Sequence, residues 1–101
     1  MRMLMSVDFP PEPFNTLARS GKVGQIISRI LEEIKPEVAY FTERDGKRGG
    51  IFVVNLERSA EVPKFSEPFF LNFNADCTFR IAMLPEDLQT ARLDDLGKKW
   101  S

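Results

Sequence analysis

The sequence predicts an α+β domain whose elements follow the order β-α-β-β-α-β, with a short helix after the last strand. Three observations predict this order. Residues 3–9 and 76–84 alternate apolar and polar side chains, the period of a strand with two different faces. Residues 14–34 and 59–73 repeat apolar side chains at helical spacing. Asp45-Gly46 lies between two strand-like runs and is a strong hairpin signal.

The first strand is predicted to end at Pro10, because proline has no N–H and fixes φ. The prolines that follow suit the first turn of a helix. We expect this helix to break near Ser20-Gly21, since glycine is unfavourable inside a helix, and to end at Pro36. Its apolar face consists of Val23, Ile26, Ile27, Ile30, Leu31 and Ile34.

Residues 37–44 and 51–56 are rich in strand-forming side chains and predict the second and third strands. Their connection, Asp45 to Gly50, is short, so the two strands should form an antiparallel hairpin. The connection holds glycines and bases, but it lacks the spacing of a phosphate-binding loop and does not precede a helix. We interpret it as a solvated turn.

The second helical region, residues 59–73, contains Pro68 and is expected to be kinked or to form two pieces. The fourth strand is predicted over residues 76–84. Pro85-Glu86-Asp87 then places proline and acids where a helix begins, so a short helix should run to about Arg92. A charged tail follows to the end of the chain.

The predicted order is that of the split βαβ, or ferredoxin-like, motif and covers residues 1–101 as a single domain. The first and third strands should lie in the middle of the sheet, with both helices on one face. The second, third and fourth strands nevertheless carry apolar residues on both sides. Because strands of this kind are usually buried on both faces, we expect a two-fold homodimer with the sheets packed face to face.

Composition excludes several kinds of chemistry. The chain has 101 residues, 14 Lys and Arg against 15 Asp and Glu, no histidine and one cysteine. The near balance of charge argues against a nucleic-acid partner. The absence of histidine excludes histidine-ligated haem and Ser-His-Asp or Cys-His catalysis. A lone Cys77 excludes an internal disulfide and a CxxC metal site, and we interpret it as a small buried hydrophobe.

Neither a targeting segment nor a membrane segment is predicted. The opening apolar run is short and ends at Asp8 and Pro10, unlike the core of a signal peptide. No stretch approaches the roughly 18 apolar residues of a membrane helix. The expectation is a cytoplasmic protein with no membrane partner, no cofactor and no metal.

Four stretches resemble the dimeric α/β-barrel superfamily of small ferredoxin-like proteins, which includes antibiotic-biosynthesis monooxygenases, muconolactone isomerases and stress-responsive barrel proteins. The stretches are Met3–Phe9, Lys35–Glu43, Ser66–Leu71 and Met83–Leu88. They are similar to a group of short bacterial proteins in that superfamily with no assigned activity. The resemblance covers nearly the whole chain and implies a fold and a homodimer. It implies little about function, because one fold hosts many activities.

Polar residues on one side of the predicted sheet form the candidate ligand site. Ser6 and Asp8 share a side of the first strand, and Thr78 and Arg80 share a side of the neighbouring fourth strand. Side chains on adjacent strands lie about 5 Å apart, so these four are expected to form one cluster, with an Asp8–Arg80 pair. The full candidate set is Ser6, Asp8, Tyr40, Asn55, Thr78 and Arg80.

Three functions remain open at this point. The first is binding of a small polar or aromatic ligand, either in a cavity between sheet and helices or at the dimer seam. The second is a cofactor-independent isomerase or monooxygenase that uses Asp8, Tyr40 and Arg80. The only tryptophan, Trp100, lies in the tail, which disfavours the oxygenases of the superfamily that use cavity Asn, Trp or His side chains. The third is a structural or interaction module in which Asp8 and Arg80 only hold the sheet together.

Overall fold

A computed structural model describes all residues, 1–101, as an α+β structure built on a four-stranded antiparallel sheet. The strand order is β2-β3-β1-β4, so the first and third strands lie in the middle, as predicted. This arrangement agrees with a ferredoxin-like fold. The elements are β1 (Arg2–Asp8), α1 (Pro11–Arg19), α2 (Val23–Ile34), β2 (Val38–Arg44), β3 (Lys47–Asn55), the 3-10 turn η1 (Ser59–Glu61), α3 (Val62–Phe73), β4 (Asp76–Ile81), α4 (Pro85–Ala91) and α5 (Leu93–Lys99).

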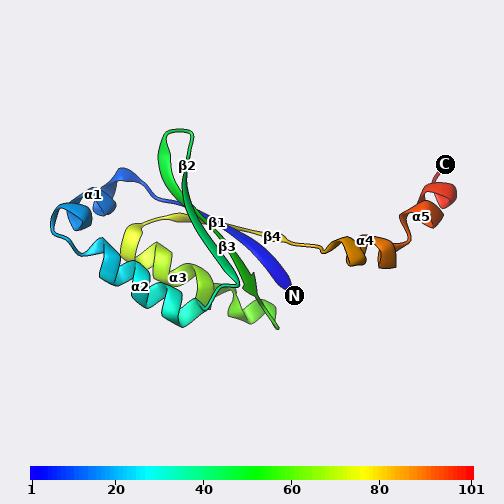
Figure 1. The fold of residues 1–101 in the computed structure, drawn as a ribbon, viewed down its shortest axis with the longest axis horizontal. Helices are drawn as coiled ribbons and strands as arrows, with labels where there is room; N and C mark the ends of the chain where they lie inside the picture. Colours follow the sequence, from blue (N-terminus) through cyan, green and yellow to red (C-terminus); the bar gives the residue numbers. More distant parts are fainter.

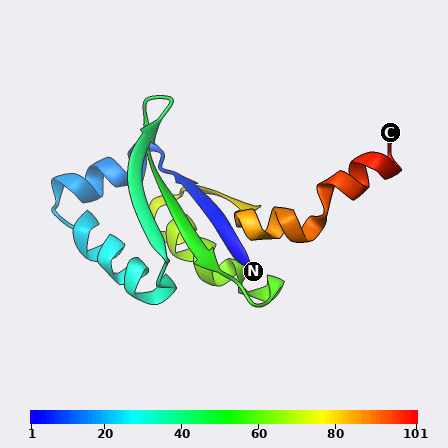
Figure 2. The same ribbon diagram turned by 45° about the vertical axis from the view of Figure 1, so that its right-hand side comes forward.

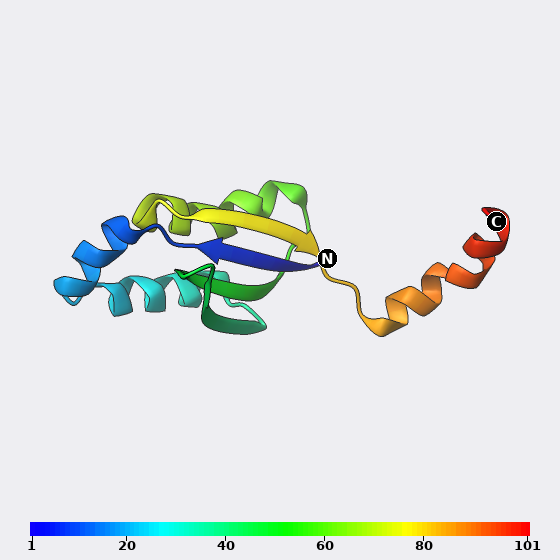
Figure 3. The same ribbon diagram turned by 90° about the horizontal axis from the view of Figure 1, so that it is seen from above.

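Helices α2 and α3 lie side by side against one face of the sheet, and the other face carries no helix (Figures 1 and 3). The core between these layers is almost entirely apolar. Met5, Phe52, Phe69 and Phe73 are each 0% exposed. Rings from the sheet and from α3 meet directly, because the centroids of Phe52 and Phe69 are 5.3 Å apart. The helix-covered face therefore supplies the hydrophobic stabilisation of the fold.

The break between α1 and α2 lies where the sequence predicts it. Gly21 has φ +72°, a left-handed conformation that glycine adopts without steric cost. The backbone N–H of Gly21 donates to Ala18 and that of Lys22 donates to Leu17, at 3.0 and 2.9 Å. These two bonds close a helix C-terminus of the Schellman type. They let α1 turn away before α2 begins.

The hairpin turn is tighter than the sequence analysis predicts. Only Asp45 and Gly46 form the turn, with φ of 54° and 77°, and β3 begins at Lys47 instead of after Gly50. Two successive positive φ angles match the right-handed twist of the flanking strands. A Cβ at Gly50 would lie 2.8 Å from the Phe52 ring, so Gly50 is a strand residue that makes room for Phe52.

Pro68 lies inside α3 and does not divide the helix into two pieces. The helix is continuous from Val62 to Phe73, and the two-piece character comes from η1 ahead of it. Proline inside a helix costs about 3 kcal/mol. Phe65, Phe69 and Phe73 are all nearly or fully buried on either side of Pro68. Because each such burial contributes roughly 1.5–3 kcal/mol, packing outweighs the cost of the proline.

The C-terminal segment extends away from the body. β4 ends at Ile81, three residues earlier than predicted, and the predicted charged tail is instead largely helix α5. All three views show α4 and α5 projecting beyond the end of the sheet where the N-terminus lies (Figures 1, 2 and 3). Every residue from Met83 to Ser101 is exposed. We call residues 83–101 the C-terminal arm.

None of the helices combines the length with the apolar character that crossing a membrane requires.

Candidate functional site

Strand register places the predicted site residues on the helix-free face, which we call the open face. One row across the sheet reads Tyr40, Ile51, Ser6 and Thr78, from β2 to β4. The next row towards the start of β1 reads Val38, Val53, Leu4 and Arg80. Tyr40, Ser6 and Thr78 are therefore brought into one row, as the period-two pattern implies.

The expected pair between Asp8 and Arg80 is wrong. Asp8 lies opposite Asp76, and Arg80 lies opposite Leu4. Asp8 follows Leu4 by four positions along β1, which is roughly 13 Å along a strand. The Asp8 carboxylate instead accepts a hydrogen bond from the Arg44 guanidinium at the end of β2. Asp8 and Arg80 therefore do not form a joint site.

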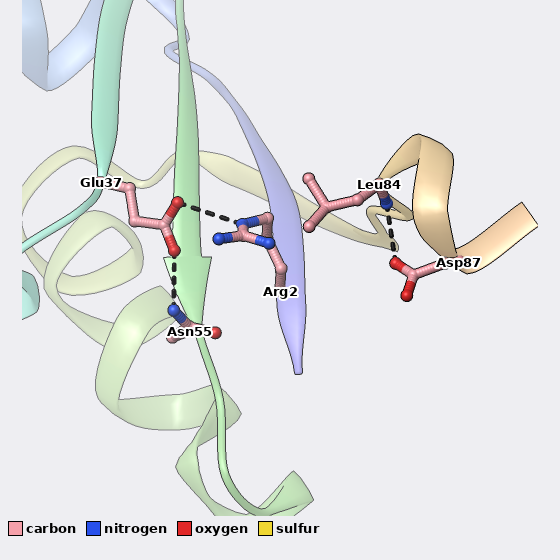
Figure 4. A network of polar contacts seen from close by, with 5 residues as sticks. All are labelled: Arg2, Glu37, Asn55, Leu84 and Asp87. Carbon is pink, nitrogen blue, oxygen red and sulfur yellow. Dashed lines mark hydrogen bonds and ion pairs between the residues drawn. The ribbon is translucent and has the colours of Figure 1, made fainter. Parts of the chain in front are cut away.

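Asn55 belongs to a separate network at the opposite end of the open face. Its side-chain amide donates to Oε1 of Glu37 at 2.7 Å. Nε of Arg2 donates to Oε2 of the same carboxylate at 3.1 Å (Figure 4). Glu37 thus ties the beginning of β1 to the end of β3. Both carboxylate oxygens are engaged, so this network holds the strands together.

The open face has an apolar centre and polar ends. Leu4, Val38, Ile51 and Val53 lie between the Asp8–Arg44 pair and the network around Glu37. A hollow of about 160 Å³ lies beside Ser6 and Asp8, below the size at which typical ligand pockets begin, near 300 Å³. A second hollow of about 330 Å³ lies beyond the Asp8–Arg44 pair and is lined mostly by charged residues at the hairpin end of the sheet. In a single chain the open face therefore resembles an interface more than a ligand cavity.

A larger pocket lies on the other side of the sheet. It has a volume of about 480 Å³, within the range of small-molecule sites. Helices α1 and α2 form two walls, and the ends of β2 and β3 near the hairpin form the third. Its principal lining side chains are Phe9, Phe14, Val23, Ile27, Phe41 and Arg48. We call it the helix-side pocket.

Arg48 is the one charged side chain of the helix-side pocket. Its guanidinium carbon lies 4.3 Å from the centroid of the Phe14 ring, a cation–π geometry. Nη1 donates to the side-chain oxygen of Asn15 at 2.7 Å. A guanidinium has five N–H donors, and this is its single side-chain partner in the structure. Arg48 therefore presents positive charge and spare donors beside aromatic walls.

Sequence analysis missed Arg48 because it assigned residues 45–50 to a solvated turn. In the structure Arg48 belongs to β3, and its backbone oxygen accepts a hydrogen bond from the N–H of Phe9 at 3.0 Å. Arg48 lies four positions before the buried Phe52 on β3, so both side chains point to the helix side of the sheet. The available signal was the tight Asp45-Gly46 turn, which would have started the strand at Lys47. Nothing in the sequence links it to Phe14.

Two ionisable groups have clearly shifted pKa values. Burial raises the pKa of the Cys77 thiol to about 12, and the nearby carboxylates of Asp76 and Asp8 act in the same direction. This thiol stays protonated and is a poor nucleophile, consistent with its interpretation as a packing residue. On the exposed helix α1, a hydrogen bond from the Thr16 hydroxyl lowers the pKa of Glu12.

Comparisons with known proteins add no assignment to this geometry. No protein-family model matches the chain, and no curated protein sequence matches it either. The structure holds no group of three or more His, Cys, Asp or Glu side chains placed to bind a metal ion. The case for a function therefore rests on the helix-side pocket and the open face.

Proposed function

We propose that the protein is a homodimeric binding protein for a small aromatic carboxylate, which it holds in the helix-side pocket. The observation that carries this proposal is a single guanidinium in the wall of an otherwise largely aromatic and aliphatic pocket. Pockets of this composition bind a ligand through apolar area and orient it through a few polar groups. The aromatic ring of the ligand would contact the apolar side chains of the pocket, and its carboxylate would bind the Arg48 guanidinium.

The aromatic walls suit a ring-bearing ligand. The ring centroids of Phe9 and Phe14 are 5.2 Å apart, edge to face. Phe41 packs edge-on against Phe52, at 5.5 Å, yet remains 51% exposed. A large aromatic side chain gains free energy when its exposed half is covered. A ligand ring seated against Phe41 and Phe14 would supply that cover.

The charge of Arg48 selects the polar group of the ligand. A guanidinium binds a carboxylate with two parallel hydrogen bonds, which are shorter and stronger than neutral ones. The bond to Asn15 holds the side chain of Arg48 in place and leaves donors free. A ligand with a neutral polar group would gain less from this contact.

The proposed homodimer uses the open face. Its apolar centre and polar ends follow the usual anatomy of an interface, a hydrophobic core within a polar rim. Ile51 and Val38 are each 38% exposed, and Tyr40 is 67% exposed, so a second sheet would cover them. This placement leaves the helix-side pocket open to ligand, because the two lie on opposite sides of the sheet.

Titration with benzoate and phenylacetate, followed by two-dimensional amide NMR, tests the ligand proposal. We expect shifts at Gly24, Ile27 and Gly49, which line the pocket. Arg48→Gln should weaken benzoate binding by about tenfold or more, since a hydrogen bond to a charged group contributes roughly 1.5–3 kcal/mol. Arg48→Lys keeps the positive charge but not the two parallel N–H donors of the guanidinium, and should lose less benzoate affinity than Arg48→Gln.

Two controls make the titration decisive. Arg80→Gln removes an equal charge from the open face and should leave benzoate binding unchanged. Benzyl alcohol keeps the ring without the carboxylate and should bind more weakly than phenylacetate. The proposal is overturned if no pocket amide shifts, if Arg80→Gln matches the loss of Arg48→Gln, or if benzyl alcohol binds as tightly as phenylacetate.

A further inference from the structure

We infer that the C-terminal arm docks on a second copy of this chain, crossing the edge of the open face in the dimer. This inference rests on the proposed homodimer and deepens it, because it names a segment that each copy contributes to the other. The arm consists of two short helices, α4 and α5, joined at Arg92, which has a left-handed φ of 58°. Every residue of the arm is exposed in the single chain.

The exposed area exceeds what one folded chain of this size leaves to water. The structure exposes 7353 Å², whereas a monomer of 11.6 kDa exposes about 5,800 Å². The radius of gyration, 17.0 Å, compares with about 13 Å for a compact chain of this length. A stable interface covers about 800 Å² on each partner, so the excess of about 1,500 Å² is enough to form one.

The arm carries apolar residues at the spacing of a docking helix. Leu93, Leu96 and Trp100 share one face of α5 and its end, at i, i+3 and i+7. Leu96 is 44% exposed, Leu93 55% and Trp100 78%. In α4, Leu88 is 45% exposed and follows Leu84 by one turn. Two helices that expose large apolar side chains at successive turns lack a packing partner.

The strand that leads into the arm directs it away from its own sheet. The backbone N–H of Ala82 still donates to Arg2, at 3.0 Å, so the chain follows β4 to that point. The Asp87 carboxylate then accepts a hydrogen bond from the backbone N–H of Leu84 at 2.7 Å and starts α4 (Figure 4). A return over its own open face would require a reversal within Met83 and Leu84. The arm can contact a partner packed against the open face without such a reversal of the chain.

The charged side chains also favour a second copy of this chain as the partner of the C-terminal arm. Arg80 lies in the apolar row of the open face, forms no ion pair and is exposed. Within the arm, Asp87 caps α4 and Asp95 pairs with Arg92 at 2.7 Å, but Glu86 and Asp94 have no cationic partner. One chain therefore offers both an unpaired base on the face and unpaired acids on the arm. Two copies related by a two-fold axis satisfy both at once.

The single tryptophan provides a direct test with the full chain. Trp100 emission and light-scattering mass are measured together over a dilution series. We expect a dimer at high concentration with blue-shifted emission, and a red shift of Trp100 that follows dissociation on dilution. Leu93→Asp with Leu96→Asp should raise the dimer dissociation constant by about tenfold or more. Leu71→Asp, a single replacement of the same kind at a leucine on α3 that is 82% exposed, should have no effect on the dimer dissociation constant.

The other outcomes separate this inference from the proposed dimer. The protein could form a dimer in which Trp100 emission stays red-shifted and which Leu93→Asp with Leu96→Asp leaves intact. That result would support the proposed homodimer and would overturn the docking of the C-terminal arm on the second copy. A monomer with blue-shifted, concentration-independent emission shows an arm folded on its own chain and overturns both. A monomer with red-shifted emission overturns both as well. The benzoate titration tests ligand binding in the helix-side pocket, and its outcome does not depend on these measurements of the dimer and the arm.

Discussion

Both faces of the sheet carry apolar side chains, but helices cover only one of the two faces. On β3, Phe52 and Val54 point towards the helices and are 0% and 1% exposed, whereas their neighbour Ile51 on the open face is 38% exposed. Adjacent residues of one strand thus have opposite surroundings, because successive side chains alternate between faces. The comparison shows that apolar strand residues become core only where a second layer covers them. In the single chain, only one face has that layer.

The largest expected effect lies in the covered face. Phe52→Ala should reduce the free energy of unfolding by about 3–5 kcal/mol, because it leaves a cavity between the sheet and α3. Urea denaturation at low protein concentration measures this loss. A loss below about 1 kcal/mol would contradict the assignment of Phe52 to the centre of the core.

A matched pair of valines compares the two faces with the same chemical change. Val54→Ala should cost about 2 kcal/mol, since both methyl groups are buried against the helices. Val53→Ala, on the half-buried open face, should cost less than about 1 kcal/mol in the monomer. Equal losses for the two variants at low concentration would show that the open face is already packed in a single chain.

A smaller effect concerns the thiol of Cys77, on the covered face opposite Val7. With its pKa raised from about 9 to about 12, alkylation by iodoacetamide at pH 8 should be about a thousandfold slower than in the urea-unfolded chain, since the thiolate is the reactive form. Because the folded chain keeps this proton where the unfolded chain loses it, the contribution of Cys77 to stability falls as the pH rises from about 9 to about 12.

Cys77→Ala isolates the contribution of this thiol to the pH dependence of stability from that of the rest of the chain. The variant should lose less stability than the parent chain between pH 8 and pH 10 in urea denaturation. Parallel pH dependences, or an alkylation rate equal to that of the unfolded chain, would place Cys77 in contact with water instead of in the packed layer.

Periodicity was enough to predict the four strands, the helices that cover the sheet and the face on which each strand residue lies, but not α5 or the bounds of β3 and β4. The alternation of residues 3–9 placed Met5 and Val7 in the core, and the helical spacing of residues 59–73 placed Phe65 and Phe69 beside them. These predictions are confirmed because amphipathic patterns reflect burial directly. Gly21 was also recognised as a helix end, since its conformational requirement is local.

Register could not be predicted, and the candidate site depended on it. Alternation assigns Asp8 and Arg80 to one face but does not say which residue lies opposite which. If the pairing of one strand against the next shifts by two residues, every side chain stays on the same face of the sheet but lies opposite a different residue. Asp8 consequently pairs with Arg44 and not with Arg80. The helix-side pocket was missed for a related reason, because the contact between Phe14 and Arg48 joins residues that no local pattern connects.

The central position of β1 has a consequence for how the chain folds during synthesis. The first strand of this domain to be synthesised, β1, pairs with β3 and with β4, and not with β2, the next strand along the chain. Until Lys47 to Asn55 have emerged, β1 has no neighbour and the apolar side of α2 has no sheet to cover. Such long-range pairing closes slowly and leaves a nascent chain exposed to aggregation. The sheet is completed only when β4, the last of its four strands in chain order, has emerged.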